Sequence, residues 1–190
     1  MSVRKFLAWI PNSLTIIRIG LIPIFVYISL FSENLDWVAA LLFAIAALTD
    51  WLDGFTARAL DATSRFGKFL DPVADKLVVL SALVIVIGQY GTIWLTIPGI
   101  IVVCRELLIS ALREWMAEIG QSGSVNVTFV AKIKTAVQMV AITMLLANPP
   151  SIDDPLVWVA IVLFYVATLL TVWSMAIYLW HARHAIHPLH

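Results

Sequence analysis

Long apolar runs alternate with short polar connections along the whole chain. A helix needs about 20 apolar residues to cross the hydrocarbon core of a bilayer. Six runs approach that length, and the expected spans are 14–31, 37–54, 77–90, 93–112, 129–147 and 156–179. The third run is short unless its helix begins nearer to Pro72. The pattern predicts an all-α integral membrane protein with six transmembrane helices, in a single domain over residues 1–190.

The first ten residues precede the first span and have a mixed character. Arg4 and Lys5 lie beside Phe6 and Trp9, which is typical of a short amphipathic helix at the membrane interface. A signal peptide would also begin with basic residues before an apolar run. Here the run continues past Arg18 to residue 31 without a small-residue cleavage pattern, so we expect it to be a retained span.

Composition supports a membrane protein. The 190 residues are 62% hydrophobic and 13% charged, whereas soluble domains are roughly half apolar and a quarter charged. The formal net charge of zero argues against a nucleic-acid partner. Cys104 is the single cysteine of the chain, so an internal disulfide is excluded.

Lysine and arginine are concentrated in alternate connections. They precede the first span, follow the second, surround the connection after the fourth and close the chain, as Arg4, Lys5, Arg58, Arg65, Lys68, Lys76, Arg113, Lys132, Lys134 and Arg183. The connections 32–36, 88–92 and 148–155 contain neither residue type. The positive-inside rule therefore places both termini and the connection after the second span in the cytoplasm.

Aspartates and small residues recur at helical spacing where the second span ends. Asp50, Asp53, Gly54, Ala57 and Arg58 stand at positions i, i+3, i+4, i+7 and i+8, which share one face of a helix. We therefore expect the second helix to continue beyond its apolar part.

A second pair of aspartates, Asp71 and Asp75, lies one helical turn apart. Asp71 suits a helix cap and Pro72 suits a first turn, so the third helix is expected to begin there. Two helix ends would then bring four carboxylates to a shared polar cleft on the cytoplasmic side. Like charges at such a site repel, and hard oxygen ligands suit Mg²⁺ or Mn²⁺.

The complete pattern resembles the signature of the CDP-alcohol phosphotransferases. The sequence reads Asp50-x-x-Asp53-Gly54-x-x-Ala57-Arg58, eight residues, then Gly67-x-x-x-Asp71-x-x-x-Asp75. The segments PNSLTIIR, RELLISALREWMAEIG and VAKIKTAVQ are similar to the branch of that family that makes phosphatidylglycerophosphate. The resemblance implies a multi-pass homodimer of the bacterial inner membrane, active in the synthesis of anionic phospholipids.

The resemblance also implies roles for the motif residues. Two ions of Mg²⁺ or Mn²⁺ would be held by Asp50, Asp53, Asp71 and Asp75, and Asp75 would also be the general base. The CDP group would be bound by Asp50, Asp53, Gly54, Ala57, Arg58, Gly67 and Asp71. Asp61 lies inside the eight-residue interval, where nucleotide contacts are also expected although the motif does not specify it.

The reaction that the resemblance implies transfers a phosphatidyl group from CDP-diacylglycerol to sn-glycerol 3-phosphate and releases CMP. An acceptor phosphate dianion requires a cationic pocket. The candidates are Arg105, Arg113, Lys132 and Lys134. Arg105 interrupts an apolar run, and an arginine within a membrane span is costly enough to suggest a function.

Simpler interpretations exist for several of these residues. Asp71 could be a helix cap, Asp61 a solvated loop residue, and Arg105 a partner that neutralises Glu106. The basic residues near the span ends could be topological anchors. Two other functions remain open: the same chemistry with phosphatidylglycerol, inositol or serine as acceptor, and a cation transporter that coordinates ions with intramembrane carboxylates.

Overall fold

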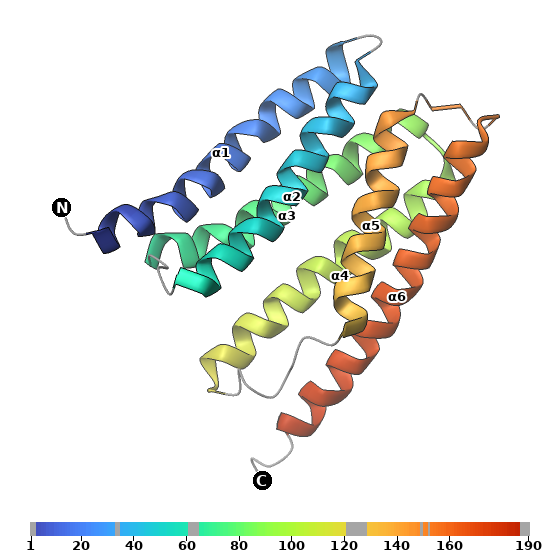
Figure 1. The fold of residues 1–190 in the computed structure, drawn as a ribbon. Helices are drawn as coiled ribbons and strands as arrows, with labels where there is room; N and C mark the ends of the chain where they lie inside the picture. The colour runs from blue at the N-terminus through green and yellow to red at the C-terminus, as the bar shows by residue number, and fades with distance from the viewer. Residues whose placement is uncertain are drawn as a thin grey trace.

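In the computed structural model, the described residues form a bundle of six α-helices (Figure 1). The helices are α1 (Val3–Phe31), α2 (Asp36–Leu60), α3 (Arg65–Tyr90), α4 (Ile93–Glu118), α5 (Phe129–Ala147) and α6 (Pro155–Ile186). The structure describes the backbone of residues 3–32, 35–60, 65–120, 129–148, 150–151 and 153–186. Within these ranges, it does not describe the side chains of 3–14, 50–60, 65–69, 71–72, 129–132, 181–182 and 184–186.

The six expected helices are all present, and their polar extensions are longer than hydrophobicity alone predicts. α5 has the expected bounds, whereas α4 and α6 continue several residues beyond their last apolar run. The continuation of the second helix past its apolar part is confirmed, because α2 reaches Leu60. Hydrophobicity marks the lipid-facing length of a helix, while backbone hydrogen bonding continues into polar sequence.

Two expected helix starts were wrong. No separate short helix precedes the first span in the described chain, because α1 is continuous from Val3 to Phe31. α3 begins at Arg65 rather than near Pro72, so Asp71 lies inside the helix and is not its cap. A proline inside a helix removes one backbone hydrogen bond, which membrane helices tolerate when neighbouring groups satisfy the freed carbonyl.

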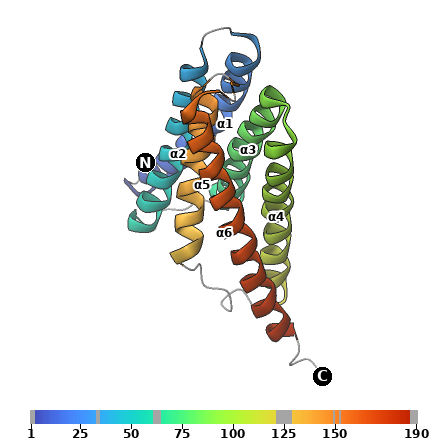
Figure 2. The ribbon, with the colours of Figure 1, turned by 90° about the vertical axis from the view of Figure 1, so that its right-hand side faces the viewer.

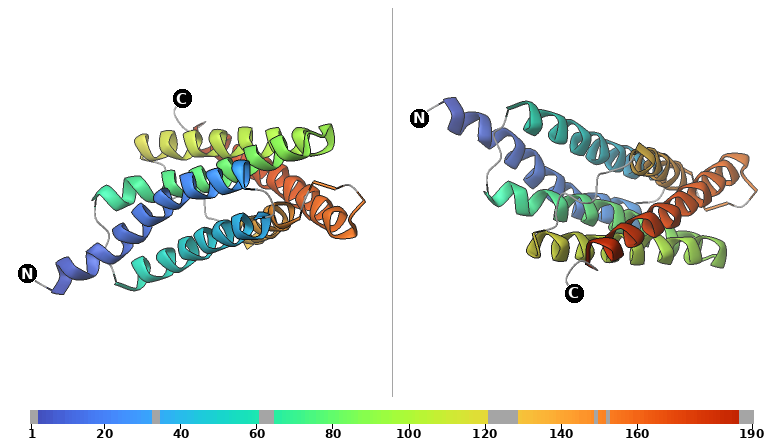
Figure 3. Two further views of the ribbon diagram at one scale, coloured as in Figure 1. Left: turned by 90° about the horizontal axis from the view of Figure 1, so that it is seen from above. Right: turned by 90° about the horizontal axis from the view of Figure 1, so that it is seen from below.

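Consecutive helices run in opposite directions along the bundle (Figure 1). α1 contacts α2 and α3, α5 contacts α2 and α6, and α4 contacts α3 and α6. Figure 2 shows α5 between α2 and α6, and Figure 3 shows α6 crossing α4 obliquely. The first residues of α1 and the last residues of α6 lie toward the end of the bundle that is opposite to the end where α2 and α6 begin (Figure 1).

The apolar core occupies one half of the bundle. Its buried residues come from the later parts of α1, α3 and α5 and the earlier parts of α2, α4 and α6, and include Phe25, Phe43, Val86, Leu95, Val102, Leu145 and Phe164. Small residues let the helices approach closely there. At Gly99, an added Cβ would lie 2.5 Å from Cδ1 of Ile87, so α3 and α4 are in tight contact at this level.

The outside of the bundle is strongly apolar. Within the described residues, three segments are long and apolar enough to cross a membrane: Val73–Tyr90, Ile93–Glu118 and Pro155–Trp180. Shorter apolar stretches are Thr15–Phe31, Asp36–Thr49 and Ile133–Ala147. Large exposed side chains such as Val84, Leu169 and Trp173 would be unfavourable in water over so wide an area. These surfaces are those of a membrane protein.

Candidate functional site

A cavity of about 1010 Å³ lies between α2, α3, α4 and α5, and Val79 of the apolar core is among its lining residues. Among the described side chains, those that line it from α2 and part of those from α5 are apolar. The charged lining residues of the described part are Asp75, Lys76, Arg105, Glu106, Arg113 and Lys134. These described residues come from three helices and comprise four cations and two carboxylates.

Glu106 connects two of these cations. Its Oε1 accepts hydrogen bonds from Arg105 Nη1 at 2.8 Å and from Lys134 Nζ at 2.6 Å. The cation side chains are only 6% and 4% exposed, and the Glu106 side chain is 24% exposed. Buried cations need a counter-charge because desolvation is expensive, and this carboxylate provides one to α4 and α5 together.

α6 holds the two arginines of α4 from the other side. Arg105 Nη2 donates to Ser174 Oγ at 2.8 Å, and Arg113 Nη2 donates to Tyr178 OH at 2.6 Å. The Arg113 guanidinium carbon is also 5.1 Å from the centroid of the Tyr178 ring, within the range of a cation–π contact. Ser174 and Tyr178 are one helical turn apart, so one face of α6 orients both guanidinium groups.

Two buried polar atoms on cavity-lining residues lack a hydrogen-bond partner in the described part of the chain. They are Arg105 Nε and Gln138 Oε1. Buried polar groups are normally hydrogen-bonded, so an unpaired donor and an unpaired acceptor are unusual. Both are consistent with a polar ligand in this cavity.

Lys76 lines the cavity next to Asp75. Its Nζ donates a hydrogen bond to Ser110 Oγ on α4. Ser110 lies between Arg105 and Arg113 along the same helix. The pair therefore adds a further cation to the wall formed by α3 and α4.

Four predicted site residues come together in this cavity: Asp75, Arg105, Arg113 and Lys134. The expected neutralising pair of Arg105 and Glu106 is also present, with Lys134 as a third member. Lys132 lies on α5, but its side chain is outside the described residues. The cavity thus contains both the predicted base and three predicted acceptor ligands.

The remaining predicted residues are placed by their backbone only or lie outside the description. Asp50, Asp53, Gly54, Ala57 and Arg58 are on the last turns of α2, and Gly67 and Asp71 are on the first turns of α3. Their side chains are outside the described residues, and so is the whole of Asp61. Among the side chains that are described, no group of three or more His, Cys, Asp or Glu residues gathers to hold a metal ion.

Lys76 in the cavity lining, and Ser174 and Tyr178, which contact its arginines, were not predicted as site residues. Lys76 had the appearance of a topological anchor, and Ser174 and Tyr178 lie in the most apolar segment of the chain. A hydroxyl pair at i and i+4 in an otherwise apolar helix was a usable signal for the last two. Nothing in the sequence indicated that they would meet arginines 65 and 69 positions earlier.

Comparison with known proteins identifies the family. The profile of the CDP-alcohol phosphatidyltransferase family matches residues 8–178. The chain belongs to this family. The match spans all six helices, so family membership covers the cavity as well as the aspartate motif.

Individual members of the CDP-alcohol phosphatidyltransferase family are similar over nearly the whole chain. A protein of Sodalis glossinidius is 48% identical over 178 residues, covering 92% of this chain and 95% of its own. Proteins of Shigella flexneri and Escherichia coli are 49% and 48% identical over 92% of this chain and 94% of theirs. Each of them is named a CDP-diacylglycerol–glycerol-3-phosphate 3-phosphatidyltransferase.

Proposed function

We propose that this protein transfers the phosphatidyl group of CDP-diacylglycerol to sn-glycerol 3-phosphate, giving phosphatidylglycerophosphate and CMP. The observation that carries the proposal is the near-full-length similarity to relatives that are named for this reaction. Membership of a transferase family favours this function over cation transport. The four cations among the described lining residues favour an acceptor with a phosphate group.

Arg105, Arg113 and Lys134 bind the acceptor phosphate, with Lys132 as a fourth ligand. Guanidinium groups match phosphate oxygens in bidentate geometry, and an ammonium adds a compact charge. Arg105 Nε is a donor that no described residue uses. Inositol and serine bring no phosphate into the cavity, so they would form fewer charge-assisted hydrogen bonds with these cations.

Asp75 accepts the proton of the attacking hydroxyl. It lines the same cavity as the cations, so a bound glycerol 3-phosphate presents its free hydroxyl on the side of α3. The hydroxyl oxygen forms a bond to the phosphorus that bears diacylglycerol, and the bond from that phosphorus to the CMP oxygen breaks. The proton moves to the Asp75 carboxylate, so CMP leaves as an anion. Positioning contributes strongly, since aspartate is a weak base.

The donor set at the junction of α2 and α3 suits Mg²⁺ or Mn²⁺. Asp50 and Asp53 on α2 and Asp71 and Asp75 on α3 offer only carboxylate oxygens, the ligands that hard divalent cations prefer. Two ions held by these carboxylates would supply positive charge against the charge that develops on the diphosphate. The nucleotide is bound by the motif residues on both helices, namely Gly54, Ala57, Arg58 and Gly67 with the aspartates, and by Asp61.

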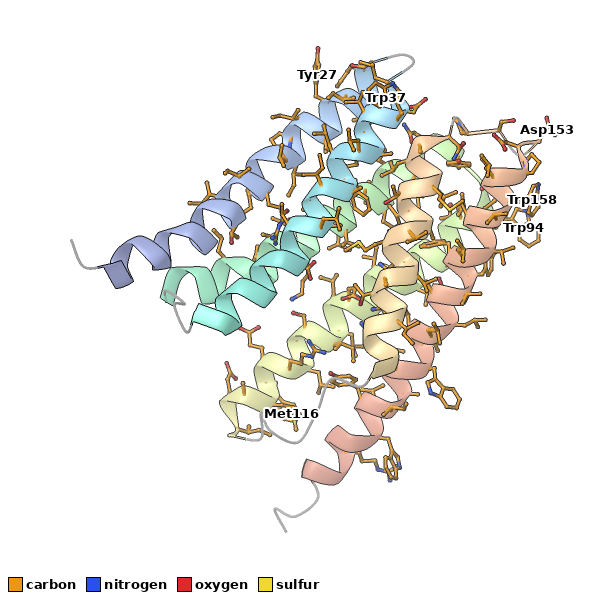
Figure 4. The ribbon with its side chains drawn as sticks, viewed as in Figure 1. Tyr27, Trp37, Trp94, Met116, Asp153 and Trp158 are labelled. Carbon is orange, nitrogen blue, oxygen red and sulfur yellow. The ribbon has the colours of Figure 1, made fainter. Side chains whose placement is uncertain are left out.

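The cavity opens toward the cytoplasm in our proposal. Exposed aromatic residues, Tyr27, Trp37, Trp94 and Trp158, gather at the opposite end of the bundle (Figure 4). The connections at that end contain no lysine or arginine. Aromatic residues gather at both interfaces of a membrane protein, and the lack of basic residues is typical of the outer one.

The length of α4 supports the same placement. Trp94 and Trp115 are both exposed and are 21 residues apart, or about 32 Å at 1.5 Å per residue. That distance is close to the thickness of the hydrocarbon core, about 30 Å. Arg113 is two residues from Trp115 along α4, close to the inner interface, whereas Arg105 lies further toward the middle of the membrane span. The cavity therefore extends inward from the inner interface, where soluble CMP and glycerol 3-phosphate meet the lipid donor in the bacterial inner membrane.

Release of CMP tests the proposed reaction directly. The purified protein in detergent is incubated with CDP-diacylglycerol, Mg²⁺ and glycerol 3-phosphate, and CMP is measured by chromatography. We expect CMP release that requires both the acceptor and the metal. Release no faster than in the sample without acceptor would defeat the proposal. In a competition assay, phosphatidylglycerol, inositol or serine is added together with glycerol 3-phosphate. A compound that suppresses formation of phosphatidylglycerophosphate would be identified as a different acceptor.

We also propose that the protein is a homodimer in the membrane, as the family resemblance implies. The many large apolar side chains on the outer surface allow a second copy to replace lipid. Light scattering of the protein–detergent complex gives the protein mass. A protein mass near twice 21.1 kDa is expected. The mass of a single chain would exclude a stable dimer in that detergent.

A further inference from the structure

Lys76 is a cation of the cavity for which the proposed mechanism has no role. It lies on α3, immediately after Asp75, and is partly buried. Its Nζ donates a hydrogen bond to Ser110 Oγ, which joins α3 to α4 at the level of the acceptor-binding arginines. The hydrogen bond holds the ammonium at the cavity wall, where solvent and ligand can reach it.

The two lysines of the cavity differ in their counter-charges. Lys134 forms an ion pair with Glu106, whereas no carboxylate of the described residues is within ion-pair distance of Lys76. A serine hydroxyl orients an ammonium but cannot neutralise it. A cation kept partly desolvated without a carboxylate favours binding of an anion.

The Lys76–Ser110 pair has hydrogen-bond donors to spare. A lysine ammonium has three N–H donors, and one is directed to Ser110. The Ser110 hydroxyl accepts that bond and keeps its own proton for donation. Lys76 lines the cavity, so up to two ammonium donors remain for the oxygens of a phosphate group.

We propose that Lys76, held by Ser110, is a further ligand of the acceptor phosphate and a determinant of acceptor specificity. The proposal rests on the proposed function. A phosphate could also come from the diphosphate of the donor, but Lys76 lines the cavity that contains Arg105, Arg113 and Lys134. The four cations surround one space from three helices, which suits a single dianion.

The position of Lys76 adds a consequence for catalysis. Lys76 and Asp75 are consecutive residues of one helix, so their backbone atoms move as a unit. A phosphate bound by Lys76 therefore fixes the rest of the acceptor relative to the Asp75 carboxylate, which takes its proton. An acceptor without the phosphate loses this alignment as well as the binding energy.

The test compares KM for glycerol 3-phosphate and KM for CDP-diacylglycerol in variants of this pair. Lys76→Gln removes the charge, Lys76→Arg keeps it, and Ser110→Ala removes the tether. Arg183→Gln is the matched control, because Arg183 is an exposed cation near the end of α6 and outside the cavity lining. Unfolding temperatures are measured for all variants in the same detergent.

Lys76→Gln is expected to raise KM for glycerol 3-phosphate at least about tenfold, as for loss of a charge-assisted hydrogen bond. Ser110→Ala should raise it a few-fold, and Lys76→Arg should recover most of the loss. KM for CDP-diacylglycerol should stay within about twofold, and the control should match wild type.

The possible failures are distinguishable. If wild-type protein releases no CMP with glycerol 3-phosphate, the proposed function fails. If wild type is active and Lys76→Gln and Ser110→Ala keep its KM for glycerol 3-phosphate, only the role of Lys76 is overturned. A selective rise of KM for CDP-diacylglycerol would assign the pair to the donor diphosphate and also overturn it. If Lys76→Gln does not fold, Ser110→Ala and Lys76→Arg decide by the same criteria.

Discussion

Replacing Glu106 by glutamine tests whether one carboxylate holds the cationic wall of the cavity together. In the native protein, a single oxygen accepts from Arg105 and Lys134 at 2.8 and 2.6 Å, and both cations are almost fully buried. Glutamine has nearly the same shape and keeps an oxygen acceptor. The substitution therefore removes the charge and little else.

The cost follows from the burial of the two cations. Removing one partner of a buried ion pair destabilises a protein by about 3–5 kcal/mol. The lower end, about 3 kcal/mol, applies here because the amide oxygen still accepts a hydrogen bond and Glu106 is partly exposed. For a chain of this size, 1 kcal/mol corresponds to about 2–4 °C in unfolding temperature. We expect Glu106→Gln to unfold about 6–12 °C below wild type.

Thermal unfolding in detergent measures this effect, and Glu114→Gln is the matched control. Glu114 is on the same helix and is exposed, so its replacement should change stability by no more than about 0.5 kcal/mol. In the double variant Glu106→Gln/Lys134→Met, one of the uncompensated cations is also removed. The double variant should therefore lose less stability than the sum of its single variants.

The same substitution should weaken acceptor binding. Without the carboxylate, Arg105 and Lys134 repel each other and no longer share a fixed position, so KM for glycerol 3-phosphate should rise about tenfold, equivalent to about 1.4 kcal/mol. KM for CDP-diacylglycerol should stay near the wild-type value. If Glu106→Gln has the same unfolding temperature as Glu114→Gln and the same KM for glycerol 3-phosphate as wild type, the proposed role of Glu106 as a shared counter-charge is wrong.

Four further outcomes are expected. Asp75→Asn should lower kcat by about 10²–10⁴-fold, as for loss of a general base, while donor binding measured by equilibrium dialysis is retained; an unchanged kcat would remove Asp75 from this role. Chelation of divalent cations should stop CMP release, and titration with Mg²⁺ or Mn²⁺ should restore it; activity that persists in excess chelator would contradict metal dependence. Tyr178→Phe removes the 2.6 Å hydrogen bond to Arg113 but keeps the ring beneath its guanidinium. KM for glycerol 3-phosphate should therefore rise only a few-fold. A rise as large as that of an Arg113→Met variant would show that the hydrogen bond, and not the ring contact, orients Arg113. Tyr90→Phe removes the hydroxyl that donates to the carbonyl oxygens of α5 and the residues that follow it, at 3.2 and 3.4 Å, and should lower the unfolding temperature by about 2–4 °C with unchanged kinetics.

Apolar runs were sufficient to predict the six helices but insufficient for their ends. Burial in lipid selects apolar residues only along the part of a helix that crosses the hydrocarbon core. α2 and α3 extend beyond that part into the aspartate motif, and the start of α3 at Arg65 could not be read from hydrophobicity. Pro72 was a misleading signal, because its fixed φ angle suits the first turn of a helix and also fits inside one.

The cavity was predictable only in part. Charge within apolar sequence identified Arg105, since an arginine in a span is expensive without a function. Its pair with Glu106 was predicted, but its hydrogen bond to Ser174 was not, because Ser174 is 69 positions away in sequence and the contact depends on how α4 faces α6. The connection between Lys76 and Ser110 likewise depends on how α3 faces α4, which is decided by packing in the other half of the bundle.

The division of the bundle into two halves explains how the chain holds so many charges. Cavity cations such as Arg105 and Lys134 cost free energy that their hydrogen bonds and one shared carboxylate offset only partly. The compensating apolar contacts lie in the other half of the same helices, where residues such as Val86, Val102 and Leu145 are fully buried. Because α3, α4 and α5 each run through both halves, the apolar core fixes the rotation of each helix about its axis. That rotation directs Lys76, Arg105 and Lys134 into one cavity, so a core substitution that turns a helix should disturb acceptor binding without touching a charged residue.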